Sequence, residues 1–180
     1  DVYKRQGKDL TSTDIAQPAI ITASLAGLKI LESLGLSADV AIGHSLGELC
    51  ALHWAKVYDE NTLIELAKIR GKAMANLNNQ KGMMASIAAN EEQVKSLLNG
   101  RVVVIAGLNS PLQTVISGAD LGVSEVMEKA QAQGFKTMSL PVSHAFHSPL
   151  VAEAIEPLRQ YLDQQTLYPL QKTIFSTVTG

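Results

Sequence analysis

The apolar positions in the first half of the chain change their period at one point. Residues 40–42 form a short continuous apolar run, which is typical of a buried strand. After it, apolar residues recur at helical spacing at Leu49, Leu52 and Ala55. The junction, residues 43–47, reads Gly-His-Ser-Leu-Gly. The pattern therefore predicts a strand, a sharp turn and a helix, with a Gly-x-Ser-x-Gly motif in the turn.

Helical periodicity also flanks this motif. A helix is expected to begin near Pro18, which is tolerated in a first helical turn, and to end at Gly35. The helix after the motif is expected to end near Val57, and Asp59 or Asn61 can cap the next one. Near the end of the chain, residues 174–178 are expected to form a further buried strand.

From about residue 83 the pattern alternates between short strands and helices. Its order, β-α-β-β-α-β, matches a ferredoxin-like unit. Strands are expected at residues 83–88, 102–106, 112–117 and 135–140, helices at 91–98 and 123–130, and a turn at 107–111. The predicted fold is α/β: an α/β-hydrolase-like parallel-sheet core over residues 1–81 and 142–180, with the ferredoxin-like subdomain inserted at 82–141.

Composition and charge narrow the class of protein. Of the 180 residues, 46% are apolar and 18% are charged, as in globular domains. The net charge of −2 implies no broad attraction to nucleic acid or anionic membranes. No apolar run approaches the ~18 residues of a membrane span, and residues 1–6 show no signal-peptide core. The single cysteine, Cys50, excludes an internal disulfide framework and fits a cytoplasmic setting as a packed thiol.

Ser45, in the predicted turn, is the candidate nucleophile. A serine needs a general base within hydrogen-bond reach, and the chain has four histidines, His44, His53, His144 and His147. The first two are expected to be structural or packed. The last two share a polar loop where the inserted subdomain ends. Two histidines in one loop could instead bind a metal, but no third ligand is evident nearby, and they could also be surface residues.

Several longer stretches carry a more specific signal. They are Gly-His-Ser-Leu-Gly-Glu at 43–48, Ile-Arg-Gly at 69–71, His-Ala-Phe-His-Ser-Pro at 144–149, Ala-Gln-Pro-Ala at 16–19 and Asn-Ser-Pro at 109–111. Together they resemble the malonyl-type acyltransferase domain of polyketide synthases and the malonyl-CoA:acyl carrier protein transacylase of fatty acid synthesis. The matching stretches run from about residue 14 to the end of the chain.

The resemblance assigns roles to individual residues. It implies that Ser45 takes a malonyl group from CoA and passes it to the phosphopantetheine thiol of an acyl carrier protein. His147 would be the base and Arg70 would pair with the free carboxylate of the malonyl group, since a guanidinium fork matches a carboxylate. Without the resemblance, Arg70 would read as a solvated helix charge.

Further residues follow from the same resemblance. His144 and Phe146 belong to the form of the motif associated with malonyl, because Phe146 would crowd a 2-methyl branch. Gln17 and Asn109 are expected near the site as binding or supporting residues, and the backbone N–H of Leu46 as one oxyanion donor. No bound cofactor or metal is implied.

Two departures from the family qualify this picture. Its N-terminal Gly-Gln-Gly segment is not found before residue 14, and the segment that supports its catalytic histidine is not found after Gly180. The sequence therefore reads as the middle of an acyltransferase domain. Two alternatives stay open: a serine hydrolase of acyl thioesters or esters, and a non-catalytic acyltransferase-like module. The expected partners are malonyl-CoA, an acyl carrier protein and other domains of a synthase, with neither nucleic acid nor membrane.

Overall fold

The chain folds into two compact units, described here from a computed structural model that covers residues 12–77, 82–98, 103–142 and 144–178. The first unit consists of Asp1–Ala75 and Glu156–Gly180, and the second of Asn76–Ile155.

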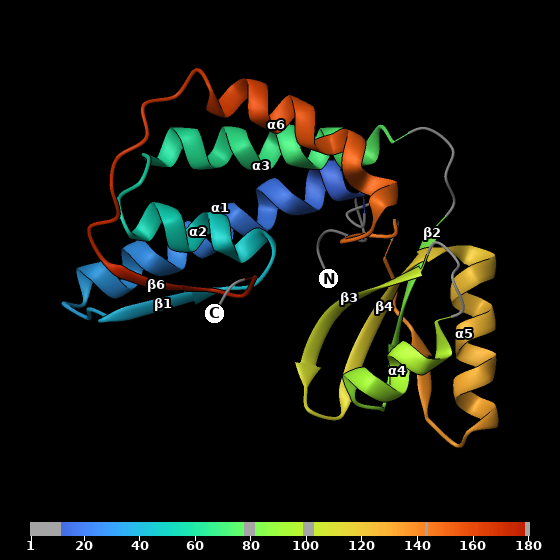
Figure 1. Ribbon diagram of the computed structural model, residues 1–180. Helices are drawn as coiled ribbons and strands as arrows, with labels where there is room; N and C mark the ends of the chain where they lie inside the picture. Colours follow the sequence, from blue (N-terminus) through green and yellow to red (C-terminus); the bar gives the residue numbers. More distant parts are fainter. Residues whose placement is uncertain (1–11, 78–81, 99–102, 143, 179–180) are drawn as a thin grey trace, which may run out of the picture. The chain divides into compact units, whose positions relative to one another are not determined.

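The first unit combines helices with a short parallel sheet (Figure 1). Its elements are α1 (Thr13–Ser33), β1 (Val40–Gly43), α2 (Leu46–Trp54), α3 (Glu60–Ala75), most of α6 (Ile155–Leu162) and β6 (Thr173–Ser176). Strands β1 and β6 pair in parallel, with Ala41 opposite Ile174 and Gly43 opposite Ser176. Helix α1 packs along α3 around a core that contains Ile21, Leu25, Leu63 and Leu66. The predicted strand–turn–helix around Ser45 is confirmed.

The predicted burial of β1 and β6 is only partly correct. Ile42 is 70% exposed and Phe175 is 51% exposed, although both belong to the expected apolar strands. Successive side chains of a strand point to opposite faces of its sheet, so a continuous apolar run places apolar side chains on both faces. The described sheet has two strands, and some of these side chains stay exposed.

Helix α1 is long and apolar enough to cross a membrane by length and composition. The same features occur in core helices of soluble domains. Here Ile21 and Leu25 are buried in the core of the first unit, and Gln17 and Thr13 are buried on the same side of the helix. One side of α1 thus packs against the first unit, while 17% of its most apolar window is buried in all.

The helix ends confirm two of the sequence predictions and contradict a third. Gly35 has φ 71° and ends α1 as expected, with the N–H of Leu36 donating to the Leu31 carbonyl. Asp59 caps α3, because its carboxylate accepts from the Thr62 N–H at 2.8 Å. The start expected at Pro18 is wrong: α1 begins at Thr13 and accommodates Pro18 inside the helix.

The second unit is a four-stranded antiparallel sheet with two helices on one face (Figure 1). Its elements are β2 (Gly82–Ile87), α4 (Glu91–Leu97), β3 (Val103–Ser110), β4 (Gln113–Ala119), α5 (Asp120–Ala132), β5 (Thr137–Ser139) and the 3-10 helix η2 (Pro149–Ala154). The strand order β3-β4-β2-β5 is that of a ferredoxin-like fold, as predicted. Val94 of α4 and Val123 of α5 meet Ile87 and Ile116 of the sheet in one core.

Two features of this unit differ from the sequence prediction. The turn expected at residues 107–111 is shorter, because β3 continues to Ser110 through register shifts after Ile105 and after Leu108. The unit also extends past residue 141, since Ala145 and Leu150 pack against Gly82 and η2 contacts β4.

Candidate functional site

The turn after β1 holds Ser45 in a strained conformation. Its φ of 53° and ψ of −112° are unusual for a residue with a side chain. This is the strand-to-helix geometry of a nucleophile elbow, which presents a serine hydroxyl at the start of a helix.

The two glycines of the motif have different physical roles. A Cβ on Gly43 would lie 2.2 Å from the Gly47 carbonyl oxygen, so only glycine permits this backbone approach. A Cβ on Gly47 would meet nothing within 4 Å. Only Gly43 therefore needs the absence of a side chain, and Gly47 contributes its backbone to the contact.

The first turn of α2 presents one backbone donor. The N–H of Gly47 donates to the His44 carbonyl at 2.9 Å, and that of Glu48 to the Ser45 carbonyl at 3.1 Å. Within the described residues, the N–H of Leu46 has no backbone acceptor. The amide of the residue after the nucleophile is where an oxyanion donor belongs in an elbow.

A partly buried polar network joins Ser45 to two helices. Arg70 of α3 donates from Nη2 to the Ser45 hydroxyl oxygen at 3.3 Å and from Nη1 to the Gln17 side-chain oxygen at 2.6 Å. Gln17, which is 5% exposed, donates from Nε2 to Thr13 Oγ1 at 2.6 Å and to the Met74 sulfur at 3.4 Å. Three residues singled out from the sequence, Gln17, Ser45 and Arg70, therefore meet within the first unit.

The environment of Arg70 suits an anionic ligand. Burial lowers the pKa of its guanidinium, which nonetheless stays charged because arginine titrates far above neutral pH. A partly desolvated guanidinium attracts a carboxylate more strongly than one in bulk water. It lies beside the candidate nucleophile, so a carboxylate on an acyl group could be bound close to the reacting carbonyl.

Glu48 ties the start of α2 to the end of β6. Its carboxylate accepts from the Thr177 hydroxyl at 2.7 Å and from the Thr177 N–H at 2.8 Å. The Thr177 hydroxyl lies 3.3 Å from the Gly43 carbonyl oxygen. The bonds from Thr177 to Glu48, above all the one from the Thr177 hydroxyl, lower the pKa of the Glu48 carboxyl group. The carboxylate thus holds the strand–turn–helix together from the side of the neighbouring strand.

The expected histidine motif forms a tight turn in the second unit. His147 is exposed and has φ 60°, a conformation that a non-glycine residue adopts only when its surroundings hold it. Buried Ser148 supplies that support, since its hydroxyl donates to the Ala145 carbonyl at 2.7 Å and accepts from the Leu150 N–H at 3.2 Å. The rings of His144 and Phe146 pack with centroids 5.8 Å apart.

Asn109 lies on β3 at the second register shift, where Leu108 pairs with Thr114 and Ser110 with Gln113. It is therefore the extra residue of a β-bulge and is exposed. Bulges commonly redirect a side chain next to a functional site. The predicted binding role of Asn109 stays a prediction.

The remaining histidines and the cysteine have structural surroundings. His53 Nδ1 lies 3.0 Å from the Tyr58 carbonyl oxygen, as expected for a packed residue. Cys50 is half-buried against the core of the first unit, and burial raises the pKa of its thiol. Across the described ranges, no group of three His, Cys, Asp or Glu side chains is placed to hold a metal ion.

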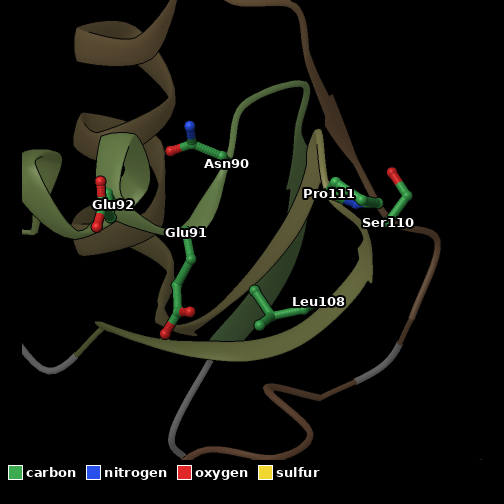
Figure 2. Close-up of a pocket in the computed structure, with 6 residues that line it drawn as sticks. All are labelled: Asn90, Glu91, Glu92, Leu108, Ser110 and Pro111. Atoms are coloured by element: carbon green, nitrogen blue, oxygen red, sulfur yellow. The ribbon is translucent and has the colours of Figure 1, made fainter.

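A separate pocket in the second unit lies between the start of α4 and the end of β3 (Figure 2). Its lining residues are Asn90, Glu91, Glu92, Leu108, Ser110 and Pro111. Two carboxylates at its rim make it unsuited to the anionic groups of a CoA thioester. None of the sequence-predicted site residues lines it.

Comparison with known proteins assigns the family. The sequence profile described as "Acyl transferase domain" matches residues 2–180. The chain belongs to the acyltransferase domain family. A phenolphthiocerol synthesis polyketide synthase of Mycobacterium tuberculosis, whose name marks it as inactive, is 37% identical over 171 residues, which are 95% of this chain and 10% of that protein.

Solved structures of the acyltransferase family are similar throughout the chain. The acyltransferase domain of an iterative polyketide synthase in enediyne biosynthesis superposes with a TM-score of 0.89 and 39% identity, over 93% of this chain and 45% of that one. The malonyl CoA-acyl carrier protein transacylase of Clostridium perfringens gives 0.87 and 32%, over 92% and 54%. The chain thus spans about half the length of these solved acyltransferases. It spans a tenth or less of the length of the phenolphthiocerol synthesis polyketide synthases that it matches.

Sequence reasoning missed two members of the buried network, Thr13 and Met74. A signal was available, because Thr13 precedes Gln17 by four residues and Met74 follows Arg70 by four, which places each pair on one helix face. The role of Glu48 was missed as well, because its partner Thr177 lies far along the chain and comes close only in the folded structure.

Proposed function

We propose that this acyltransferase domain carries the site of a malonyl-type enzyme, in which Ser45 transfers a malonyl group from CoA to the phosphopantetheine thiol of an acyl carrier protein. The observation that carries the proposal is the hydrogen bond between Arg70 Nη2 and Ser45 Oγ, 3.3 Å long, at a strained elbow. It puts a carboxylate-binding group beside the nucleophile. In a site for uncharged acyl groups, a half-buried guanidinium at this position would have no binding partner on the substrate.

The proposed reaction has two matched halves. Ser45 Oγ attacks the thioester carbonyl of malonyl-CoA while His147 takes the hydroxyl proton, and the C–S bond breaks with CoA leaving as the thiol after it receives that proton. The carrier-protein thiol then gives its proton to His147 and attacks the Ser45 ester. The serine oxygen leaves and regains a proton from His147. The N–H of Leu46 would stabilise the negative oxygen in each tetrahedral intermediate.

Selection of the extender group would follow from two residues. Arg70 would hold the malonyl carboxylate through its guanidinium fork. Phe146 would oppose a methyl branch at C2, and excluding one methyl group by packing is worth only ~1–3 kcal/mol, so the preference should be finite. The similarity to the malonyl CoA-acyl carrier protein transacylase of Clostridium perfringens supports this substrate class.

The test compares two thioesters that differ in the carboxylate. In an Arg70→Ala variant, kcat/KM for malonyl-CoA should fall by about 10²–10⁴, because two charge-assisted hydrogen bonds of about 1.5–3 kcal/mol each are lost. Turnover of acetyl-CoA, which lacks the carboxylate, should change by no more than a few-fold. Arg159→Ala, at an exposed arginine of α6, is the matched control.

Two results would contradict the proposal. Equal losses with both thioesters would give Arg70 a structural role. Steady release of free malonate, without malonyl-carrier protein, would indicate a hydrolase.

A further inference from the structure

The orientation of the Gln17 side chain decides how Arg70 is held. The Gln17 oxygen accepts from Arg70 Nη1 at 2.6 Å, so the NH₂ group faces the other way. A guanidinium has donors but no acceptor. If the amide were flipped, its NH₂ group would face the guanidinium, and Arg70 would lose this partner.

Two residues hold the Gln17 amide in the observed orientation. The Gln17 NH₂ group donates to Thr13 Oγ1 at 2.6 Å and to the Met74 sulfur at 3.4 Å. A methionine sulfur only accepts, so Met74 weakly favours the observed direction of the amide. A threonine hydroxyl can donate or accept, so Thr13 makes the stronger bond and holds the amide in its place without choosing its direction. Thr13 is 6% exposed and Gln17 is 5% exposed, so water does not readily replace this bond. Thr13 therefore contributes most to fixing the amide.

The backbone keeps Thr13 in place. A Cβ on Gly71 would lie 2.8 Å from the Thr13 carbonyl oxygen and 2.9 Å from Asp14 Cα. The start of α1 thus rests directly on the glycine that follows Arg70. Thr13, Gln17 and Arg70 consequently form one continuous chain of contacts that ends at Ser45.

We infer that Thr13 is a positioning residue, which acts through the Gln17 amide to aim the Arg70 guanidinium at the acyl group on Ser45. The inference rests on the proposed function, in which Arg70 binds the malonyl carboxylate. Its consequence is specific: Thr13 should matter for acyl groups with a free carboxylate and hardly at all for those without one.

The experiment measures kcat/KM for malonyl-CoA and acetyl-CoA in three variants. Thr13→Val, which keeps the shape and removes the hydroxyl, should lower the malonyl value about tenfold, the effect of one buried hydrogen bond, and the acetyl value less than twofold. Thr13→Ser restores the hydroxyl and should recover the malonyl value. Thr114→Val is the matched control, since buried Thr114 makes its side-chain bond to the Ala89 carbonyl in the second unit.

A fourth variant and a second readout keep the inference testable. Met74→Leu, which conserves volume, should lower the malonyl value selectively and by less than Thr13→Val. In NMR spectra without substrate, the Nη hydrogens of Arg70 should give separate signals that merge in the Thr13→Val protein. An Arg70→Lys spectrum would assign them.

The outcomes separate the inference from the proposed function. Equal losses with both thioesters, or no loss with either, would overturn the positioning role. If the unsubstituted protein takes up no malonyl group, the proposed function fails. The NMR signals then decide the positioning role: unchanged signals in the Thr13→Val protein would refute it.

Discussion

The two glycines around Ser45 should respond in opposite ways to the same substitution. In Gly43→Ala, the added Cβ would lie 2.2 Å from the Gly47 carbonyl oxygen and 2.5 Å from the Glu48 nitrogen. Both neighbours are backbone atoms, which cannot rotate away, so the strand and the helix must separate. In Gly47→Ala the new methyl group meets nothing within 4 Å.

The magnitudes follow from these contacts. Overpacking typically costs about 1–3 kcal/mol, and the upper end applies to Gly43 because backbone must move. The lower chain entropy of alanine offsets roughly 0.5–1 kcal/mol, which leaves a net loss of about 2 kcal/mol. A shift of about 1 Å at the nucleophile would also lower the acylation rate about 10²-fold. Gly47→Ala lies in a helix and should gain up to about 1 kcal/mol.

Urea unfolding and acylation kinetics on the two purified variants test this reasoning. Gly43→Ala should lose stability and nearly all acylation, whereas Gly47→Ala should be at least as stable as the unsubstituted protein and react within a few-fold of its rate. If the two variants behave alike, the inference that only Gly43 needs the absence of a side chain is wrong.

Three other predictions concern single side chains. Asn90→Ala should cost about 1 kcal/mol in urea unfolding, because Asn90 and Gln93 form a reciprocal capping box at the start of α4, with bonds of 2.9 and 3.0 Å; an unchanged midpoint would deny the cap any role. Thr177 lowers the pKa of Glu48, so the carboxylate stabilises the fold above its unfolded pKa of 4.5 and loses this effect as pH falls through the lower folded value. The melting temperature of an E48Q variant should therefore lie below that of the unsubstituted protein at pH 7, and the two should converge as the pH falls through the lowered folded pKa of Glu48; a pH-independent gap would refute the assignment. Phe146→Ala should raise the methylmalonyl-to-malonyl ratio of kcat/KM up to about tenfold, and an unchanged ratio would remove Phe146 from selection.

Local sequence patterns predicted most of the elements because their determinants are local. The βαββαβ order could be read from short apolar runs, and Gly35 and Asp59 marked helix ends through their own backbone and side-chain chemistry. The errors arose where tertiary structure decides. Pro18 is tolerated inside α1, and the bulges of β3 extend a strand through a stretch rich in turn-forming residues.

The site was predictable only in part. The motif around Ser45 and the resemblance singled out Gln17 and Arg70, which meet in the fold although 53 positions separate them. Thr13 and Met74 carry no catalytic chemistry of their own, and their helical spacing from Gln17 and Arg70 becomes informative only once the contacts of the Gln17 amide are known. The same holds for Thr177, whose contact with Glu48 spans 129 positions.

The central claim is that Ser45 becomes a malonyl ester. Intact-protein mass spectrometry after brief incubation with malonyl-CoA tests it most directly, beside methylmalonyl-CoA and a Ser45→Ala control. The account predicts a malonyl adduct on the unsubstituted protein, a weaker methylmalonyl adduct, and neither on the Ser45→Ala protein. A malonyl adduct that persists in the Ser45→Ala protein would contradict it.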